Sequence, residues 1–326
     1  MSDISGAVSK QLPKIAVAIC TRQRPIMLQE CMGSVLSQLA ERGADDCLFI
    51  IENDVVPSCE DMVKELASEY PEVKVVYYNE QELGIPMARN RALQLAMESG
   101  ADWMAFLDDD STLTPGWLST ISEEISRQTA DALHGPIRQM WPADMPMWLR
   151  REKKKTPKTG ARIGGACTNN ILIRLDWLRT RSSGFWFNAD MRFSGGEDTD
   201  FFRRARREGM RIIWINEAVV CEKVVEERTK LRWFFNRSMK TSTNSVIISY
   251  GMSGKRKTIK RYIPKVPQKF LEAIVYALAG LLVLPFNRFE GMRNLAKSVR
   301  TLGSSIGYLR GLLRKNLNPY KTIEGY

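Results

Sequence analysis

The sequence predicts an α/β fold, in which helices flank a mostly parallel sheet and a basic helical extension follows at the C-terminal end. Two observations predict the sheet. Short apolar runs alternate with stretches of helical periodicity as far as about residue 130, and each strand–helix pair has the length of a βαβ unit. A third observation predicts the extension, because the chain beyond residue 228 has helical patterns and many Lys and Arg residues.

Four apolar runs in the first half predict strands at residues 15–20, 48–51, 73–78 and 103–107. Helical patterns follow them at residues 26–40, 60–70, 86–99 and 114–127, and we expect Ser58 to cap the second helix. Further along, strands are predicted at residues 170–174 and 211–215, with a helix at 197–208 between them. Residues 140–159, with Trp141 and Trp148, predict a long loop that either closes over a ligand or packs on the surface.

Charge and cysteine usage narrow the classes of protein. The net charge of +11 and the pI of about 9.4 favour an anionic partner, such as nucleic acid, anionic lipid or a phosphorylated substrate. Six cysteines are scattered without a C-x-x-C pair, which argues against a zinc site or disulfide framework and suits a reducing compartment. The polar first 14 residues do not have the pattern of a secretory signal.

The motif FLDDDS places Asp108, Asp109 and Asp110 directly after an apolar strand. Three adjacent carboxylates repel one another unless a cation neutralises them. Mg²⁺ and Mn²⁺ prefer such oxygen ligands and share their shell with substrate phosphates. The motif therefore predicts either a metal–diphosphate site or an exposed acidic turn before the next helix.

The motif GGEDTDFFRRARREG places Glu197 and Asp198 in the first turn of a predicted helix, behind two glycines. Glycines let a ligand approach the backbone closely, and a carboxylate there is suited to act as a general base. The alternative is that these acids only complement the helix dipole. A metal–diphosphate site and a separate base together are what a displacement at a sugar anomeric carbon requires.

Several motifs in a fixed order carry a resemblance to a known family. They are IAVAICTRQRP, FIIEND, NEQELGIPMARNRAL, FLDDDS, GACTNNILIR, GGEDTDFFRRARREG and EKVVEERTKLRW. The chain resembles the family 2 glycosyltransferases, which have the Rossmann-like GT-A fold, and is most similar to bacterial enzymes that build exopolysaccharide and related surface glycans. The resemblance covers about residues 13–240.

The resemblance implies roles for residues after the first two strands. Thr21 and Arg24 would approach the nucleotide base and its phosphates. An acidic residue after the second strand would contact the base. Here that stretch reads Glu-Asn-Asp instead of the usual paired aspartates, so either Glu52 or Asp54 takes this role.

The remaining donor residues follow from the same resemblance. Arg89 and Asn90 match a stretch near the nucleotide, and Asp108 would contact the ribose or the sugar. Asp109 occupies a variable middle position beside the donor, and Asp110 would bind Mg²⁺ or Mn²⁺. UDP is the expected carrier of the sugar.

Asp198 matches the catalytic base of the family, with Glu197 beside it, and the implied mechanism is inverting. Residues 229–233, TKLRW, resemble the Q-x-x-R-W motif of processive relatives but lack the leading Gln. We therefore expect transfer of a single sugar to a saccharide or lipid-linked acceptor.

The predicted division is a catalytic domain at residues 1–240 and a basic helical region at 241–326. An apolar run at 273–286 with basic flanks is too short for a standard membrane span but suits an anionic membrane surface. The alternative is a helical hairpin that covers the catalytic domain or a dimer interface. We expect a cytoplasmic protein, peripheral on the inner face of the cell membrane.

Three other functions fit parts of the sequence. A nucleic-acid-binding protein is disfavoured because no recognisable binding motif accompanies the basic residues, so no nucleic acid partner is expected. A nucleotidyltransferase is the second, but CTRQRP lacks the glycines and lysine of a phosphate loop. A non-catalytic membrane scaffold is the third, and the presence of Asp108, Asp110 and Asp198 argues against it.

Overall fold

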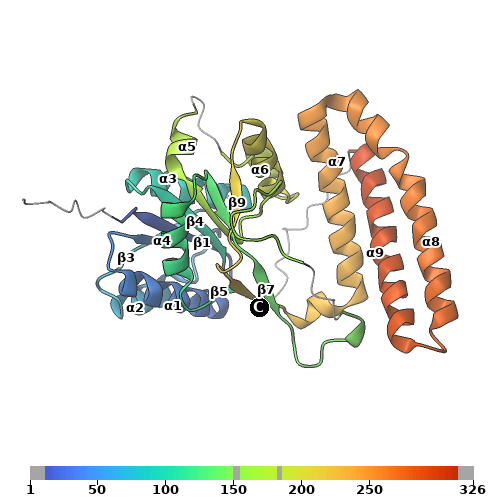
Figure 1. Cartoon of the computed structure of the whole chain (residues 1–326), viewed down its shortest axis with the longest axis horizontal. Helices are drawn as coiled ribbons and strands as arrows, with labels where there is room; N and C mark the ends of the chain where they lie inside the picture. Colours follow the sequence, from blue (N-terminus) through green and yellow to red (C-terminus); the bar gives the residue numbers. More distant parts are fainter. Residues whose placement is uncertain (1–11, 150–154, 182–185, 315–326) are drawn as a thin grey trace, which may run out of the picture.

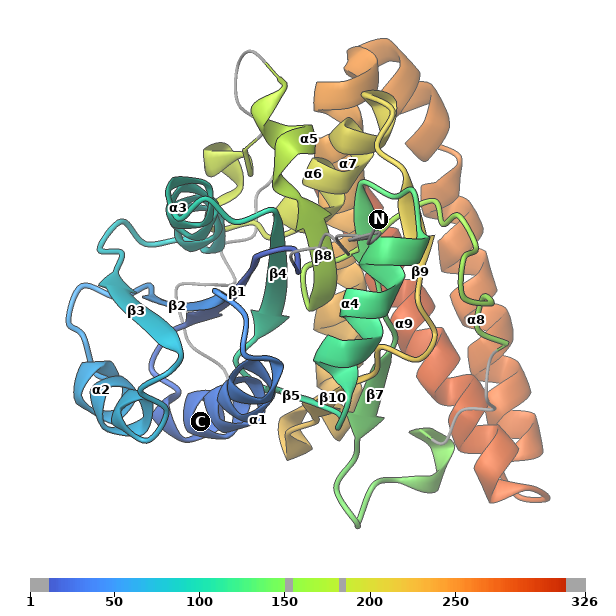
Figure 2. The ribbon, with the colours of Figure 1, turned by 60° about the vertical axis from the view of Figure 1, so that its left-hand side comes forward.

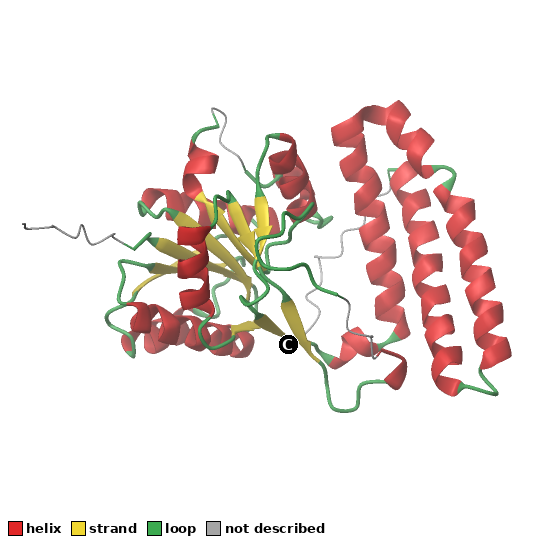
Figure 3. Ribbon diagram, viewed as in Figure 1, coloured by secondary structure: helices red, strands yellow, loops and turns green. Residues whose placement is uncertain are grey.

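The computed structural model describes residues 12–149, 155–181 and 186–314. An α/β layer lies on one side of the molecule, and three long helices stand beside it (Figure 1). Colouring by secondary structure separates the two parts, with all strands in the first (Figure 3). The expected α/β fold with a helical C-terminal region is confirmed.

The main sheet has seven strands in the order β3-β2-β1-β4-β8-β6-β9. Their bounds are Lys74–Asn79 (β3), Cys47–Glu52 (β2), Ile15–Thr21 (β1), Trp103–Asp108 (β4), Asn170–Arg174 (β8), Ala132–His134 (β6) and Ile212–Trp214 (β9). Strand β8 runs antiparallel to both of its neighbours, whereas the other pairs are parallel. Because β1, β2 and β4 are parallel and adjacent, the residues that follow them lie at one edge of the sheet.

Helices cover both faces of the sheet (Figure 2). Apolar residues of α1 (Pro25–Arg42), α2 (Glu60–Ser68) and α4 (Trp117–Arg127) form a core with one face. Residues of α3 (Ile85–Glu98), α5 (Leu175–Arg179) and α6 (Glu197–Arg207) form a second core with the other. This double coverage explains why the strands are continuous apolar runs instead of alternating ones.

Two local predictions were wrong. The N-cap of α2 is Cys59, without a side-chain cap, because the Ser58 hydroxyl donates instead to Glu52 at 2.7 Å. The helix predicted from residue 114 begins at Trp117, since β5 (Ser111–Leu113) joins a second sheet.

The second sheet has the order β5-β10-β7, with β7 at Ile137–Met140 and β10 at Val220–Lys223. It pairs Ser111, directly after the three aspartates, with Glu222. The predicted loop at 140–159 contains the short helix η1 (Met147–Leu149), and its residues 150–154 lie outside the described residues. Trp148 packs edge-to-face against Phe234, with ring centroids 5.7 Å apart.

The C-terminal helices are α7 (Leu231–Tyr262), α8 (Lys265–Val283) and α9 (Arg288–Leu312). Helix α9 lies between the other two and contacts both (Figure 1). Helix α7 is continuous across residue 240, the proposed limit of the catalytic domain, and kinks at Gly254. The other short elements are η2 (Ala189–Met191) and η3 (Glu226–Thr229).

Candidate active site

Most polar residues predicted to bind a donor lie at or just after the ends of β1, β2 and β4, at one edge of the main sheet, whereas Arg89 and Asn90 lie on α3. Strand register places Cys20 beside Asp108, and Thr21 beside Glu52. The three aspartates are therefore next to the loop that follows β1.

Asp109 is an anchor between that loop and the end of β4. Its carboxylate accepts a hydrogen bond from Thr21 Oγ1 at 2.8 Å and forms an ion pair with Arg24 Nη1 at 3.2 Å. Burial raises the pKa of Asp109, and Arg24 and Thr21 oppose that shift. The structure thus brings Thr21, Arg24 and Asp109 together as one cluster.

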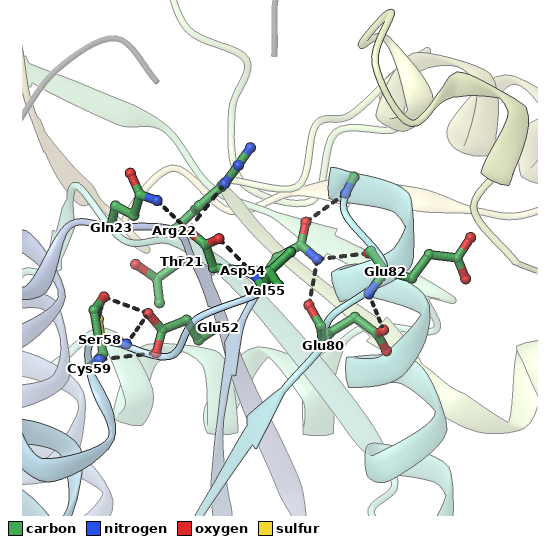
Figure 4. A network of polar contacts seen from close by, with 12 residues as sticks. Thr21, Arg22, Gln23, Glu52, Asp54, Val55, Ser58, Cys59, Glu80 and Glu82 are labelled. Carbon is green, nitrogen blue, oxygen red and sulfur yellow. Dashed lines mark hydrogen bonds and ion pairs between the residues drawn. The ribbon is translucent and has the colours of Figure 1, made fainter. Parts of the chain in front are cut away.

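Glu52 and Asp54, the two candidates for the nucleotide-contacting acid, have different surroundings (Figure 4). Glu52 is fully buried and accepts hydrogen bonds from Ser58, Cys59 and Tyr77 at 2.6–3.0 Å. Burial alone would raise the pKa of Glu52, but these donors outweigh it and the pKa is lowered. Glu52 therefore ties β2 and β3 to the loop before α2.

Asp54 faces the loop that follows β1 instead (Figure 4). Its carboxylate accepts from Gln23 Nε2 at 2.5 Å and lies 3.5 Å from Arg22 Nε. Gln23 has a left-handed backbone with φ of 53°, a conformation that is costly for a residue with a side chain and is common at functional sites. Of the two acids, Asp54 is the one beside Arg22 and the predicted nucleotide-binding loop.

Arg89 connects the end of β4 with the start of α6. Its guanidinium forms an ion pair with Glu197, and its Nη2 lies 3.5 Å from Asp108 Oδ1. The Arg89 and Glu197 side chains are 10% and 5% exposed, whereas Asp108 is 43% exposed. Desolvation raises the pKa of Asp108 to about 6, with Arg89 opposing the shift and Asp110, Asp198 and Glu197 adding to it. One buried cation therefore holds the two predicted acidic motifs together.

Asp110 belongs to a second charged cluster. Arg228, from η3, reaches Asp110 Oδ2 with Nη2 at 3.2 Å and Glu222 Oε1 with Nη1 at 2.5 Å. Desolvation raises the pKa of Asp110, Arg228 opposes this, and Glu222 adds to it. Here the guanidinium of Arg228 neutralises the neighbouring carboxylates of Asp110 and Glu222, and a divalent metal could neutralise neighbouring carboxylates in the same way.

The side chains that could coordinate a metal here fit an ion held jointly by the protein and a substrate. Within the described residues, no group of three or more His, Cys, Asp or Glu side chains is arranged to hold a metal alone. Mg²⁺ is commonly bound through one or two carboxylates together with substrate phosphates. Asp110, with Asp108 two residues before it, matches that pattern.

The predicted base, Asp198, lies in the first turn of α6, and helix α7 holds the loop that precedes it. Gly195 and Gly196 both have positive φ, and Asn244 of α7 donates from Nδ2 to Ser194 O at 3.0 Å. A Cβ on Gly196 would lie 3.2 Å from the Asn244 side chain, so the close approach favours glycine. Asp198 Oδ1 accepts from Thr199 N at 2.5 Å. Helix α7 thereby contributes to the placement of Asp198.

Asn90 is placed away from this cluster. Its side chain donates to Phe187 O at 2.9 Å and accepts from Phe187 N at 2.8 Å. These two bonds secure the segment before η2 on α3. The Asn90 side chain thus positions the backbone of Phe187, and its contact with the sugar nucleotide stays a prediction.

Four residues of the site were not assigned a role from sequence: Arg22, Arg228, Glu222 and Asn244. Arg228 and Glu222 lie inside the resemblance, in the stretch EKVVEERTKLRW, but nothing local to that stretch indicates a partner 118 residues earlier. Asn244 lies beyond the resemblance, in a helix with no chemical motif. An ion pair across such a separation is visible only in three dimensions.

Known proteins share this architecture. A mannosyltransferase from Pyrobaculum calidifontis, solved in complex with GDP-Man and Mn²⁺, aligns over 94% of this chain and 89% of its own, with a TM-score of 0.59 and 13% identity. S. aureus TarS 1-349 in complex with UDP-GlcNAc aligns over 91% of both chains, with a TM-score of 0.52 and 13% identity. The fold is thus that of the GT-A glycosyltransferases.

Sequence relatives identify the family. Residues 16–181 match Glycosyl transferase family 2. The succinoglycan biosynthesis protein ExoM of Rhizobium meliloti is 32% identical over 232 residues, 70% of this chain and 72% of its own. The glucosyl-dolichyl phosphate glucuronosyltransferase of Haloferax volcanii is 24% identical over 325 residues, 93% of this chain and 98% of its own. The protein is a glycosyltransferase and belongs to family 2.

Proposed function

We propose that the protein transfers one sugar from a nucleoside-diphosphate sugar, with UDP as the first candidate carrier, to a saccharide hydroxyl with inversion at the anomeric carbon. The observation that supports this proposal is the contact of the buried Arg89 guanidinium with both the buried Glu197 and the half-exposed Asp108. This contact joins the motif at the end of β4, which we propose for the metal and diphosphate, to the motif that begins α6, which we propose for the base.

On the donor side, Asp110 and Asp108 would hold Mg²⁺ or Mn²⁺, which would neutralise charge on the departing diphosphate. Arg24 and Arg22 lie next to the same edge of the sheet, paired with Asp109 and Asp54. Their positive charge suits a nucleotide phosphate.

On the acceptor side, Asp198 would remove the proton from the attacking hydroxyl. Its neighbour Glu197 is buried against Arg89, so Asp198 is the better placed of the two to meet a substrate. Direct attack by that hydroxyl requires no covalent intermediate, and therefore leads to inversion.

We propose further that the acceptor is a lipid-linked saccharide of exopolysaccharide or surface-glycan synthesis, and that the protein is cytoplasmic and docks on the membrane through α8. The names of the relatives from R. meliloti and H. volcanii, which mention succinoglycan and glucosyl-dolichyl phosphate, support this acceptor class.

Helix α8 supports the docking proposal. Most of the run predicted to be too short for a span lies in this 19-residue helix, which is long and apolar enough to cross a membrane by length and composition, so that prediction was wrong. The most apolar window of the helix is 11% buried. Large apolar side chains are exposed along one face, at the spacing of a helical stripe: Phe270, Leu271, Ile274, Val275, Leu278, Leu281 and Leu282. Lys255, Lys257 and Lys260 lie shortly before it, and cations beside an apolar stripe favour an anionic lipid surface.

The transfer proposal is tested by calorimetry with UDP, GDP, CMP and dTDP, with and without Mn²⁺, followed by assays with their sugars. We expect metal-dependent binding of one nucleotide and its loss in Asp110→Ala. Asp198→Asn should keep donor binding and lose about 10²–10⁴-fold in transfer, while Asp190→Asn, an exposed acid of η2, serves as the control. Equal activity of Asp198→Asn and the parent would overturn the base assignment and favour a scaffold.

The docking proposal is tested by flotation with vesicles that contain phosphatidylglycerol. Leu282→Glu should weaken binding, whereas Val56→Glu should not, and both parent side chains are 72% exposed. A folded parent protein that does not bind these vesicles would contradict the docking.

A further inference from the structure

Three arginines converge on a hollow between α6 and α7 that the transfer mechanism does not use. The hollow has a volume of about 210 Å³ and is lined by Arg203, Arg207, Ser249, Met252, Ser253 and Arg261. Arg203 and Arg207 come from α6, and the other four residues come from α7. The lining contains three cations, two hydroxyls and no carboxylate.

The kink in α7 shapes this hollow. Gly254 leaves the helical conformation with φ of 75° and ψ of 166°, a backbone that favours glycine. On one side of the kink, Arg207 Nη1 donates to Met252 O at 3.0 Å. Across it, the hydroxyls of Ser249 and Thr258 lie 3.0 Å apart. The kink therefore allows residues 249–253 and Arg261 to line one space together with α6.

In the described part of the chain, the arginines of this hollow have no acidic partner. Among the ion pairs of residues 12–149, 155–181 and 186–314, none joins Arg203, Arg207 or Arg261 to a carboxylate. By contrast, Arg204 on the same helix pairs with Asp200 at 2.7 Å. An adjoining hollow of about 350 Å³ shares Arg203 and Arg207 and adds a fourth arginine, Arg206. Positive charge thus accumulates here, and no carboxylate of the described residues forms an ion pair with Arg203, Arg207 or Arg261.

Helix dipoles account for only part of this pattern. Basic residues occupy the last turns of both α6 and α7, where a cation contributes about 0.3–1 kcal/mol. The helix dipole explains why cations are favourable at the end of each helix. It does not explain why the cations of α6 and those of α7 face the same hollow. Convergence of like charges is unfavourable unless an anion is held between them.

We propose that this hollow is a binding site for a phosphate or diphosphate group. Guanidinium groups match phosphate oxygens through paired hydrogen bonds, and Ser249 and Ser253 supply hydroxyls. Pockets for drug-sized ligands measure roughly 300–1,000 Å³, so a hollow of about 210 Å³ suits a phosphoryl group better than a whole sugar nucleotide.

The position of the hollow deepens the proposed function and rests on it. Arg207 is nine residues after Asp198 on α6, about 14 Å along the helix axis. Figure 1 shows α6 beside the upper part of α7, at the same end of the helical layer where α8 begins. A lipid head group held there would have its apolar chain near α8 and its sugar directed toward Asp198. The phosphate has two possible sources, a lipid head group or a soluble phosphate.

The test uses the full-length protein in a chelator, so that metal-dependent donor binding does not contribute. Inorganic diphosphate is titrated by calorimetry into the parent, into Arg203→Gln/Arg261→Gln, and into Lys255→Gln/Lys257→Gln. Both double variants lose two charges, but Lys255 and Lys257 do not line the hollow. The lysine variant is therefore the control for inorganic diphosphate only, because these lysines belong to the proposed docking surface and their loss would also weaken binding to vesicles. In parallel, phosphatidylcholine vesicles are prepared with undecaprenyl diphosphate, or with phosphatidylglycerol at equal charge.

We expect the arginine variant to bind diphosphate about tenfold or more weakly than the parent, and the lysine variant to bind within about twofold of it. Preferential loss of binding to undecaprenyl diphosphate vesicles would identify a lipid diphosphate as the source. Loss confined to inorganic diphosphate would identify a soluble one.

Equal losses in the two double variants, or no binding by the folded parent, would overturn the site. Sugar transfer is measured separately. If the parent transfers sugar but does not bind diphosphate in this hollow, this inference alone is refuted. If the parent shows no transfer but the arginine variant loses diphosphate binding, the proposed function alone is refuted.

Discussion

Arg89→Met removes the cation that holds the two acidic motifs together. Met keeps much of the length of the side chain but leaves Glu197, whose side chain is 5% exposed, without its ion-pair partner. One oxygen of Glu197, Oε2, already has no hydrogen-bond partner among the described residues. The substitution therefore leaves an uncompensated charge in the interior, which is the most destabilising way to break an ion pair.

Breaking a buried pair in this way costs about 3–5 kcal/mol. An unfolding entropy of roughly 2.1 cal/mol/K per residue gives about 0.7 kcal/mol/K for a chain of 326 residues. The expected fall in Tm is therefore about 4–7 °C. Differential scanning calorimetry at pH 7 measures it directly.

Arg91→Met is the matched control. Arg91 lies on the same helix and pairs with Glu80 at 3.1 Å, but its side chain is 28% exposed. A more exposed pair contributes about 0–1 kcal/mol, so its Tm should fall by less than about 1.5 °C.

A second variant separates the ion pair from simple loss of packing. Adding Glu197→Gln to Arg89→Met removes the unpaired charge, so the double variant should regain about 1 kcal/mol or more. If Arg89→Met melted like Arg91→Met, or if Glu197→Gln brought no recovery, Arg89 would not be the electrostatic link that we describe.

Three further predictions concern regions away from that pair. Burial lowers the pKa of His134 to about 4 from 6.5, so its neutral form stabilises the fold above pH 6.5 by about 3 kcal/mol, and that contribution is lost as the pH falls toward 4. It is the single histidine of the chain, and its NMR signal should not titrate between pH 5 and 8; a midpoint near 6.5 would contradict the burial. Gly307→Ala would place a Cβ 2.3 Å from Met239 O and should cost about 1–3 kcal/mol in urea unfolding. Gly251→Ala, with nothing within 4 Å, should instead be neutral or stabilising by up to about 1 kcal/mol, and the opposite order of the two would refute the close approach of α7 and α9. Because the pKa of Glu52 is lowered in the folded protein, Glu52→Gln should destabilise by about 1–3 kcal/mol at pH 7, and the difference should shrink as the pH falls below about 4.5; a difference independent of pH would show that its charge does not matter.

Local sequence patterns predicted most strands of the main sheet closely, because most of these strands are apolar runs buried on both faces. Residues 170–174 were predicted as a strand with the bounds that β8 has. Its antiparallel direction, between β4 and β6, was not indicated by any pattern. Direction depends on the path of the chain between strands, which apolar periodicity does not encode.

Capping and helix starts were less predictable for a similar reason. Ser58 is a common N-cap residue, yet Glu52 competes for its hydroxyl from the end of a neighbouring strand. A tertiary hydrogen bond to a carboxylate outweighs a local preference. Helix α4 begins later than predicted because β5, just before it, pairs with β10, which is more than 100 residues later in the sequence.

The sequence by itself determined which chemistry the chain carries. Three carboxylates after an apolar strand and two more behind paired glycines indicated a metal–diphosphate site and a base, since these properties belong to short stretches of chain. Their order and the surrounding motifs indicated the family, which the comparisons confirmed.

The tertiary structure decided how these groups meet. Arg89 pairs with an acid 108 residues away, Arg228 with one 118 residues away, and Asn244 of α7 supports the loop before Asp198. The kink at Gly254 allows cations from the ends of α6 and α7 to line one hollow. Such contacts depend on how whole elements pack, and packing is set by side-chain shape and burial summed over the fold rather than by any local pattern.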